Sequence, residues 1–462
     1  MIRLFKHYIP KPVFALGFVE IVILAVAITM GLTVRFTQLD LLPIQYGHHL
    51  PVFATFVIIV YVSMLAVGLY QTESCRDIRI MVVRLPIAML LSFIMMSVAS
   101  FVLPDVSIWR SIFAYSIGFA IVGIVISRIV FTHVADLDLF RQRVIVLGAG
   151  ARAERIRNME KFSSNRGFYC VAAVRMTDNE TQIAGARDFD DVRPLVKFAE
   201  AHEANEIVVA SEERRGTLPV AELLACKMEG FKITDATTFI EQQTGAVDLE
   251  SMSPSWLIFS DGFVGSSQVD LVLKRGFDIL ASLILLCISL PILIGTAVVI
   301  RLTSPGPIFY RQERVGQGGK PFMVMKFRSM RTDAEKNGPQ WAQKNDARVT
   351  PVGQFIRASR IDEIPQIFNV LKGDMSFVGP RPERPVFVEE LALEIPYFHE
   401  RHRVKPGITG WAQINYPYGA SVEDARHKLQ YDLYYIKNYT IFLDFLVLIQ
   451  TLRVVIWPDG VR

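Results

Sequence analysis

The sequence predicts a membrane protein of mixed α/β class that has three parts. These are four N-terminal transmembrane helices, a Rossmann-like doubly wound domain, and a C-terminal α+β domain that carries a re-entrant helical hairpin. Long apolar runs fill residues 1–138, and short apolar runs alternate with helical patterns over 139–260. A later apolar run, inside the third part at 265–462, is interrupted by Pro291. The chain of 462 residues is 51% hydrophobic and 20% charged, which suits two or three domains.

Four apolar runs in the N-terminal part are long enough to cross a membrane. A helix rises about 1.5 Å per residue and the hydrocarbon core is about 30 Å thick, so roughly 20 residues suffice. Backbone amides in the bilayer must be satisfied internally, which favours helices. The predicted spans are residues 12–34, 50–70, 85–103 and 111–134. Glu20 lies in the first span, where it is either functional or directed at neighbouring helices or headgroups.

Lysines and arginines gather on one side of these spans and predict their orientation. On that side lie Arg3, Lys6, Lys11, Arg76, Arg79, Arg84, Arg128, Arg141 and Arg143. The two opposite loops carry only Arg35 and Arg110. The positive-inside rule therefore places the N-terminus and the region after residue 135 in the cytoplasm. A net charge of +4 does not indicate nucleic-acid binding, and the four cysteines match no metal or disulfide spacing.

The middle part alternates strand and helix patterns, which is typical of a parallel doubly wound sheet. Its strand candidates are residues 144–147, 169–174, 206–210 and 231–234. The first strand is followed by Gly148 and Gly150, which form a turn of the kind that cradles phosphate at a helix N-terminus. The third glycine position holds Ala153, and no acidic residue ends the second strand. A tight turn without a ligand is therefore an equally good interpretation.

Two other functions fit a membrane anchor joined to a Rossmann-like domain. One is a membrane-anchored nucleotide-sugar-modifying enzyme such as a dehydratase. Such an enzyme needs a second dinucleotide domain with a Tyr-x-x-x-Lys pair, and the sequence contains neither that pair nor a second glycine fingerprint after a strand. The other is a nucleotide-sensing scaffold, which remains an alternative at this point.

The apolar run at residues 277–300 is predicted to be a re-entrant helix, within 272–302, rather than a fifth span. Cations flank it on both sides: Lys274 and Arg275 before it, and Arg301, Arg311 and Arg314 after it. Cations at both ends favour a cytoplasmic location for both. Pro291 lacks an amide hydrogen and its ring clashes with the preceding turn, which kinks a helix. We therefore expect the helix to enter the membrane, bend and return.

Candidate catalytic residues follow this run. Thr350 and Pro351 provide a good helix start, and the predicted helix continues through the adjacent carboxylates Asp362 and Glu363, about 100° apart on its surface. Further on, Pro380, Arg381 and Pro382 form a turn, and Lys326, Arg328 and Arg357 supply more cations. Carboxylates that hold Mg²⁺ or attack phosphorus, together with phosphate-binding arginines, are typical of phosphoryl transfer.

Residues 272–462 closely resemble the bacterial sugar transferases, which are monotopic polyprenyl-phosphate phosphoglycosyl transferases. The shared blocks are Lys274-Arg275 with Asp278, the proline-broken hairpin, residues 326–330, 362–366, 369–376, 378–382 and 405–411. The whole chain resembles the large members that initiate exopolysaccharide synthesis, and its first ten residues resemble the exosortase-associated subgroup. One departure is the segment Ala358-Ser359-Arg360, just before the two carboxylates. Many members have a small polar residue next to the carboxylates, where this chain has Arg360.

The resemblance implies a polyprenyl-phosphate sugar-phosphate transferase of the bacterial inner membrane, with its catalytic domain in the cytoplasm. Asp362 would attack the β-phosphorus of a UDP-sugar, release UMP, and pass the phosphosugar to undecaprenyl phosphate. Glu363 would hold Mg²⁺. The substrate phosphates would be bound by Lys326, Arg328, Arg357 and Arg381, with Pro380 and Pro382 shaping the turn.

The resemblance leaves other points open. Asp432 matches another acidic residue of the family, although a structural ion pair is an equally ordinary role for it. The sugar is not identified, and the resemblance only favours glucose or galactose. A homodimer is compatible with the resemblance, and no nucleic-acid partner is expected.

Overall fold

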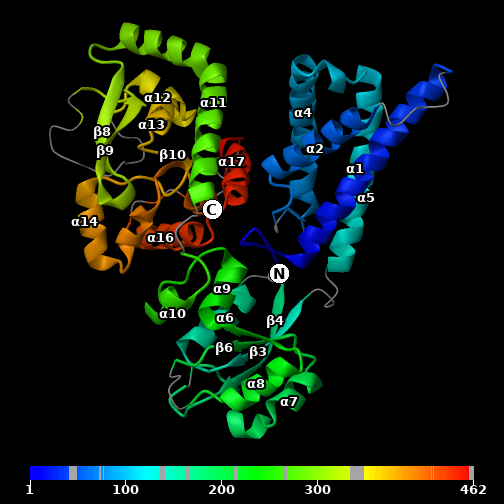
Figure 1. Cartoon of the computed structure of the whole chain (residues 1–462), viewed down its shortest axis with the longest axis vertical. Helices are drawn as coiled ribbons and strands as arrows, with labels where there is room; N and C mark the ends of the chain where they lie inside the picture. Colours follow the sequence, from blue (N-terminus) through cyan, green and yellow to red (C-terminus); the bar gives the residue numbers. More distant parts are fainter. Residues whose placement is uncertain are drawn as a thin grey trace. The chain divides into compact units, whose positions relative to one another are not determined.

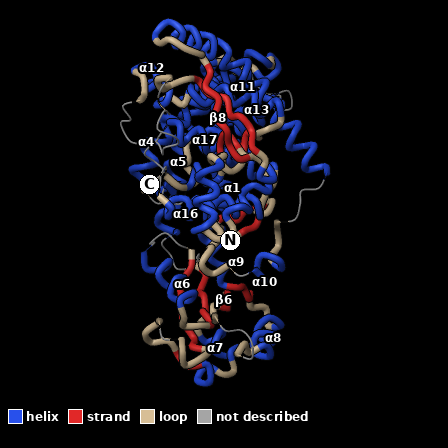
Figure 2. Tube along the Cα trace, turned by 90° about the vertical axis from the view of Figure 1, so that its left-hand side faces the viewer, coloured by secondary structure: helices blue, strands red, loops and turns tan. Residues whose placement is uncertain are grey.

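A computed structural model provides the structure of the chain (Figure 1). The residues that it describes are 1–40, 49–71, 74–75, 77–135, 141–162, 167–180, 182–212, 217–252, 254–263, 268–332, 334, 348–417, 419 and 421–456. The chain divides into two compact units. The first comprises Met1–Leu4 and Tyr8–Thr244, and the second comprises Phe5–His7 and Gly245–Arg462. Helices make up most of the described chain, and the strands form small sheets (Figure 2).

The first unit begins with apolar helices that match the four predicted spans. After the short strands β1 (Ile2–Leu4) and β2 (His7–Ile9) come α1 (Lys11–Gln38), α2 (Leu50–Ala66), α4 (Ile78–Val102), η2 (Pro104–Val106) and α5 (Arg110–Ala135). By length and composition α1, α4 and α5 can each cross a membrane, whereas α2 has 17 residues and is slightly shorter. Exposed apolar side chains cover much of these helices, as expected for contact with lipid.

Glu20 on α1 has a partner inside the first unit. Its carboxylate forms a bidentate ion pair with Arg128 on α5, with Oε1 2.6 Å from Nε and Oε2 3.1 Å from Nη2. The exposed fractions of the two side chains are 0% and 1%. The Nη1 atom of Arg128 also donates to the carbonyl of Leu69, at 2.8 Å. Glu20 therefore joins two helices. This agrees with the interpretation of the sequence in which Glu20 is directed at neighbouring helices.

The doubly wound domain is confirmed, with five parallel strands in the order β5-β4-β3-β6-β7. The strands are β3 (Gln142–Leu147), β4 (Phe168–Arg175), β5 (Arg187–Asp188), β6 (Glu206–Val209) and β7 (Lys232–Asp235). The helices are α6 (Ala151–Phe162), η4 (Phe189–Val192), α7 (Leu195–Ala201), α8 (Val220–Met228) and α9 (Ala236–Thr244). On β3, Val144 and Val146 pack with α6 and α9, while Ile145 and Leu147 pack with α7 and α8. Helices therefore cover both faces of the sheet.

The second unit contains the long helix α11 and the mixed catalytic-domain fold. In order, its elements are α10 (Pro254–Phe259), α11 (Gln268–Thr303), β8 (Phe309–Val315), η5 (Gln317–Gly319), β9 (Pro321–Phe327), α12 (Pro351–Ala358), η6 (Ile361–Gln366), α13 (Ile367–Lys372), β10 (Ser376–Val378), α14 (Pro385–Glu394), η7 (Phe398–Arg403), β11 (Gly407–Thr409), α15 (Trp411–Asn415), α16 (Val422–Lys437) and α17 (Ile441–Ile456). Strands β8 and β9 form an antiparallel hairpin, and β10 pairs with β11 in parallel.

Helix α11 is bent and contains Pro291, as predicted (Figure 1). It is apolar enough to enter a membrane, and exposed apolar residues occur around much of its surface. Its beginning is fixed to the catalytic fold: Lys274 Nζ lies 2.6 Å from Asp444 Oδ2, and Asp278 Oδ1 accepts from Ser376 Oγ at 2.9 Å. One end of α11 is therefore anchored in protein. A return of the helix to the same membrane face stays a prediction.

The boundary between the doubly wound and catalytic parts differs from the predicted position near residue 260. The segment that begins at Gly245 belongs to the second unit. The indole Nε1 of Trp411 donates to the Gly245 carbonyl at 2.8 Å, and the Val247 amide donates to the Gln430 carbonyl at 3.0 Å. These contacts make the segment part of the C-terminal fold.

The buried pair of Glu20 and Arg128 generates a prediction about stability. Removing one partner of a buried ion pair leaves an uncompensated charge and costs about 3–5 kcal/mol. We expect Glu20→Leu and Arg128→Met each to lower the thermal midpoint of the full chain in detergent. The double variant should unfold at a higher temperature than either single variant. A double variant that is less stable than both would contradict this explanation.

Candidate active site

The two predicted catalytic carboxylates lie on a short 3-10 turn, not on a continuous α-helix. Helix α12 starts as predicted, because Thr350 Oγ1 accepts from the Gly353 amide at 2.9 Å. It ends at Ala358, and Arg360 then adopts a left-handed conformation with φ of 54°. The expectation of one helix through Asp362 was therefore wrong. The break follows from Arg360, because a residue in the left-handed conformation cannot continue a right-handed α-helix.

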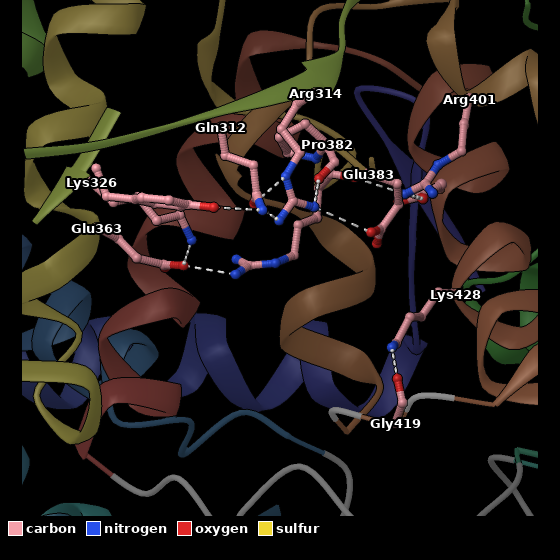
Figure 3. A network of polar contacts seen from close by, with 12 residues as sticks. Gln312, Arg314, Lys326, Glu363, Pro382, Glu383, Arg401, Gly419 and Lys428 are labelled. Atoms are coloured by element: carbon pink, nitrogen blue, oxygen red, sulfur yellow. Dashed lines mark hydrogen bonds and ion pairs between the residues drawn. The ribbon is translucent and has the colours of Figure 1, made fainter. Parts of the chain in front are cut away.

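Glu363 is held by two cations that come from different segments (Figure 3). Its Oε1 atom accepts from Lys326 Nζ at 3.0 Å and from Arg381 Nη2 at 2.7 Å. Its side chain is 12% exposed. Burial alone would raise the pKa of Glu363, but the charges of Arg381 and Lys326 outweigh it and hold the pKa well below its usual range. Glu363 is therefore ionised at neutral pH and fixed in position.

Asp362 has a different environment from its neighbour. Its side chain is 9% exposed, and no hydrogen bond or ion pair joins its carboxylate to another of the residues that the structure describes. Burial raises the pKa of Asp362, and the negative charge of Glu363 raises it further. The positive charges of Lys326, Arg357 and Arg381 act in the opposite direction. The site thus pairs a fixed carboxylate with one that has no such ion pair.

The loop that carries Arg381 is held through its backbone. The carbonyl of Arg381 accepts from Arg401 Nη2 at 2.9 Å, and the carbonyl of Pro382 accepts from Arg314 Nη1 at 3.0 Å (Figure 3). Arginines from β8 and η7 therefore fix the two adjacent peptide groups. This backbone support orients the side chain of Arg381 towards Glu363.

Arg401 is in turn paired with Asp432. The sequence was compatible with either a family-specific role or a structural ion pair for Asp432. The Nη2 atom of Arg401 lies 2.9 Å from Asp432 Oδ2, and both side chains are buried. Burial raises the pKa of Asp432 to about 6, although the charge of Arg401 opposes this shift. Asp432 is therefore ionised at neutral pH. Its contact supports a positioning role through Arg401.

A cavity of about 500 Å³ is lined by part of this constellation. Its charged and polar lining includes Arg360, Glu363, Arg381, Glu383, Arg401, Gln413, Tyr416, Lys428 and Asp432. Its apolar lining includes Leu285 of α11, Ile364, Ile367, Ile408, Ile414 and Val454. Lys428 Nζ donates to the carbonyl of Gly419 at 2.6 Å (Figure 3). Asp362 is next to the lining residue Glu363 but does not itself belong to the lining.

Two of the predicted phosphate-binding cations, Arg328 and Arg357, form hydrogen bonds to other parts of the fold. Arg328 is directed into the turn after α11, where its guanidinium donates to the carbonyls of Ser304 and Pro305 at 2.9 Å and 2.7 Å. Gly306, next to these carbonyls, has φ of +120°, a conformation that favours glycine. This position does not support a phosphate-binding role for Arg328. Arg357 is near Asp362, but its Nε atom donates to Ser329 Oγ at 2.8 Å.

The sequence interpretation missed several residues that line this cavity or support the loop of Arg381. Arg314 was noted only as a flanking cation of the hairpin, and Arg401 and Lys428 were not singled out. Arg401 lies in the charged sequence Glu400-Arg401-His402-Arg403, which resembles a solvated surface segment. No local pattern distinguishes a buried arginine in such a run, because its partner Asp432 is far away in the sequence.

Comparisons with known proteins match two parts of the chain. A family model described as bacterial sugar transferase matches residues 269–458, and one described as CoA-binding domain matches residues 65–215. The chain is 43% identical over 240 residues to a UDP-N-acetylgalactosamine-undecaprenyl-phosphate N-acetylgalactosaminephosphotransferase of Aeromonas hydrophila. This match covers 52% of the chain and 56% of the relative.

Two further relatives match the C-terminal part. The chain is 45% identical over 188 residues to a UDP-glucose:undecaprenyl-phosphate glucose-1-phosphate transferase of Escherichia coli (strain K12), which covers 40% of each protein. It is 42% identical over 192 residues to an exopolysaccharide production protein of Rhizobium leguminosarum bv. phaseoli. That match covers 40% of the chain and 94% of the relative.

The chain belongs to the bacterial sugar transferase family, as the resemblance in its sequence predicted. It spans about half the length of the Aeromonas relative, 56%, and 40% of the Escherichia relative. The matched part makes up almost the whole length of the Rhizobium relative. The exosortase-associated subgroup stays a prediction.

Proposed function

We propose that the protein transfers a phosphosugar from a UDP-sugar to undecaprenyl phosphate and releases UMP, which starts exopolysaccharide assembly. The observation that supports this most strongly is the composition of one cavity. Its charged wall contains Glu363 and Arg381, and its apolar wall includes Leu285 from the membrane-type helix α11. The UDP-sugar carries a charged diphosphate, which the charged wall can bind. Undecaprenyl phosphate carries a phosphate on a long apolar chain, so it needs both a charged and an apolar wall.

In the proposed first step, an Asp362 carboxylate oxygen forms a bond to the β-phosphorus of the UDP-sugar. The bond from that phosphorus to the oxygen shared with the α-phosphate breaks, and UMP leaves with this oxygen. In the second step, a phosphate oxygen of undecaprenyl phosphate attacks the phosphorus of the phosphosugar-aspartate. Asp362 is released as a carboxylate, and the product is a diphosphate-linked lipid sugar. A displacement split in two in this way is covalent catalysis.

The cations next to the carboxylates have a proposed role in both steps. Arg381 binds phosphate oxygens through its planar guanidinium, and Lys326 adds a point charge at the same position. Glu363 holds both cations through Oε1, so they are oriented before substrate arrives. Arg314 and Arg401 keep the loop of Arg381 in place through its carbonyls.

Mg²⁺ is the proposed cofactor, and the carboxylates present fit it. Among the described residues no group of three or more His, Cys, Asp or Glu side chains is placed to hold a metal. Mg²⁺, however, often takes only one or two carboxylates and completes its shell with water and substrate phosphates. Glu363 Oε2 can contribute, since its ion-pair contact within the described residues, to Arg360 Nη1, is as long as 3.9 Å. When bound, the metal would neutralise diphosphate charge.

The proposed location is the inner membrane of a bacterium, with the catalytic unit on the cytoplasmic side. Support comes from the positive-inside pattern of the sequence and from cations on both flanks of α11. UDP-sugars are cytoplasmic metabolites, so this orientation also gives the enzyme access to its donor. The sugar is best approached with a panel, because the names of the relatives include both N-acetylgalactosamine and glucose.

Asp362→Asn tests the proposed function directly. It keeps the shape of the side chain but removes the attacking charge, so UMP release should fall by about a thousandfold or more. Purified full chain would be incubated with undecaprenyl phosphate, Mg²⁺ and each UDP-sugar of the panel, and UMP would be measured. Glu390→Gln, on the exposed part of α14, is a matched control that should leave the rate unchanged. Near-normal turnover by Asp362→Asn would exclude Asp362 as the nucleophile.

The pH dependence of turnover provides a second test of Asp362. Because its pKa is raised, the acidic limb of kcat/KM should lie above the ordinary aspartate range, and the rate should fall as pH decreases through it. Arg357→Gln removes a positive charge that lowers this pKa, so the limb should move to higher pH. Lys320→Gln is the control, because Lys320 is exposed, does not line the cavity and is not among the charges that shift the pKa of Asp362. An unmoved limb in Arg357→Gln would contradict the assignment.

A further inference from the structure

The glycine turn of the doubly wound domain already has anionic partners from its own chain. In dinucleotide-binding folds, free amides at this turn and at the following helix N-terminus bind phosphate. Here the Ala149 amide donates to Glu180 Oε2 at 3.0 Å. The Ala151 amide, at the start of α6, donates to Glu212 Oε1 at 2.9 Å. Two carboxylates therefore occupy donors that a phosphate ligand would need.

Glu180 lies where three strands end. Its Oε2 atom also accepts from the Met176 amide at 3.0 Å, and its Oε1 atom accepts from Ser211 Oγ at 2.9 Å. Ala149, Met176 and Ser211 follow the carboxyl ends of β3, β4 and β6, which are adjacent in the sheet. This is the crevice in which open α/β sheets bind ligands, since the strand order reverses beside β3. The residue Glu180 is only 5% exposed.

The turn also lies in close backbone contact with the segment that follows β6. Gly148 has φ of +130°, and a Cβ atom added there would be 2.7 Å from both the Ala210 carbonyl carbon and the Ser211 nitrogen. The Gln182 amide donates to the Ala149 carbonyl at 3.0 Å and ties the segment that carries Glu180 to the turn. Backbone contact and hydrogen bonds thus both close the crevice.

We infer that the Glu180 carboxylate is the permanent occupant of the anion site in this domain. The domain consequently takes no coenzyme A, dinucleotide or other phosphate ligand at its glycine turn, although it matches a CoA-binding family model. Gly148 and Gly150 serve the close approach of the turn to β6 and to Glu212, not a nucleotide. This inference does not depend on the proposed transferase activity.

Hydrogen exchange on the full chain in detergent tests the inference. Peptides that contain Ala149, Ala151 and Met176 would be followed with and without coenzyme A, NAD and ATP, each at about 1 mM, a concentration that detects even weak sites. We expect no change in exchange at these amides with any of the three ligands. Ligand-dependent protection of the Ala149 and Ala151 amides would overturn the inference, because it would show that a phosphate compound displaces the carboxylates.

A variant tests the role of the carboxylate itself. Glu180→Ala removes the acceptor, so exchange at the Ala149 and Met176 amides should become about tenfold faster or more. Adding inorganic phosphate should slow that exchange again in the variant but not in the wild type. Glu200→Ala, an exposed acidic position on α7, is the matched control and should change nothing at the turn. Unchanged exchange in Glu180→Ala would contradict the inference. If this variant does not fold, the wild-type measurement still decides.

Discussion

The carboxylate of Glu363 joins segments that are far apart in the sequence, and the arrangement of the candidate site depends on it. Lys326 comes from β9, Glu363 from η6, and Arg381 from the loop after β10. In a partly buried site, two cations brought together without a counterion would repel each other strongly. Glu363 removes that repulsion and fixes both cations before any substrate binds.

The contrast between the two adjacent carboxylates gives the site its proposed chemistry. Glu363 is ion-paired and its pKa is lowered, whereas Asp362 has no ion pair within the described part of the chain and its pKa is raised. A fixed acid organises charge, and an acid without a partner is available to attack phosphorus. Behind them, Asp432 and Arg401 support the backbone of the Arg381 loop. The site therefore consists of reacting groups supported by a buried layer of ion pairs.

The sequence predicted the elements well where one local signal dominates. Apolar runs predicted the membrane helices, and Pro291 predicted the bend of α11. The alternation of strand and helix patterns predicted the parallel sheet. It predicted Glu363 and Arg381, which share one cavity, because their motifs match a known family. It failed where tertiary contacts decide. The left-handed Arg360 broke the predicted helix, and Arg328 is directed into a turn.

The central claim is that Asp362 becomes covalently attached to the phosphosugar. Wild-type enzyme would be mixed with UDP-sugar and Mg²⁺ without lipid acceptor, quenched rapidly, and examined by intact-protein and peptide mass spectrometry. The account predicts a mass increase of one phosphosugar on the peptide that contains Asp362, and none in Asp362→Asn. If no adduct forms and UMP release strictly requires undecaprenyl phosphate, the lipid phosphate attacks the donor directly and the covalent account is wrong.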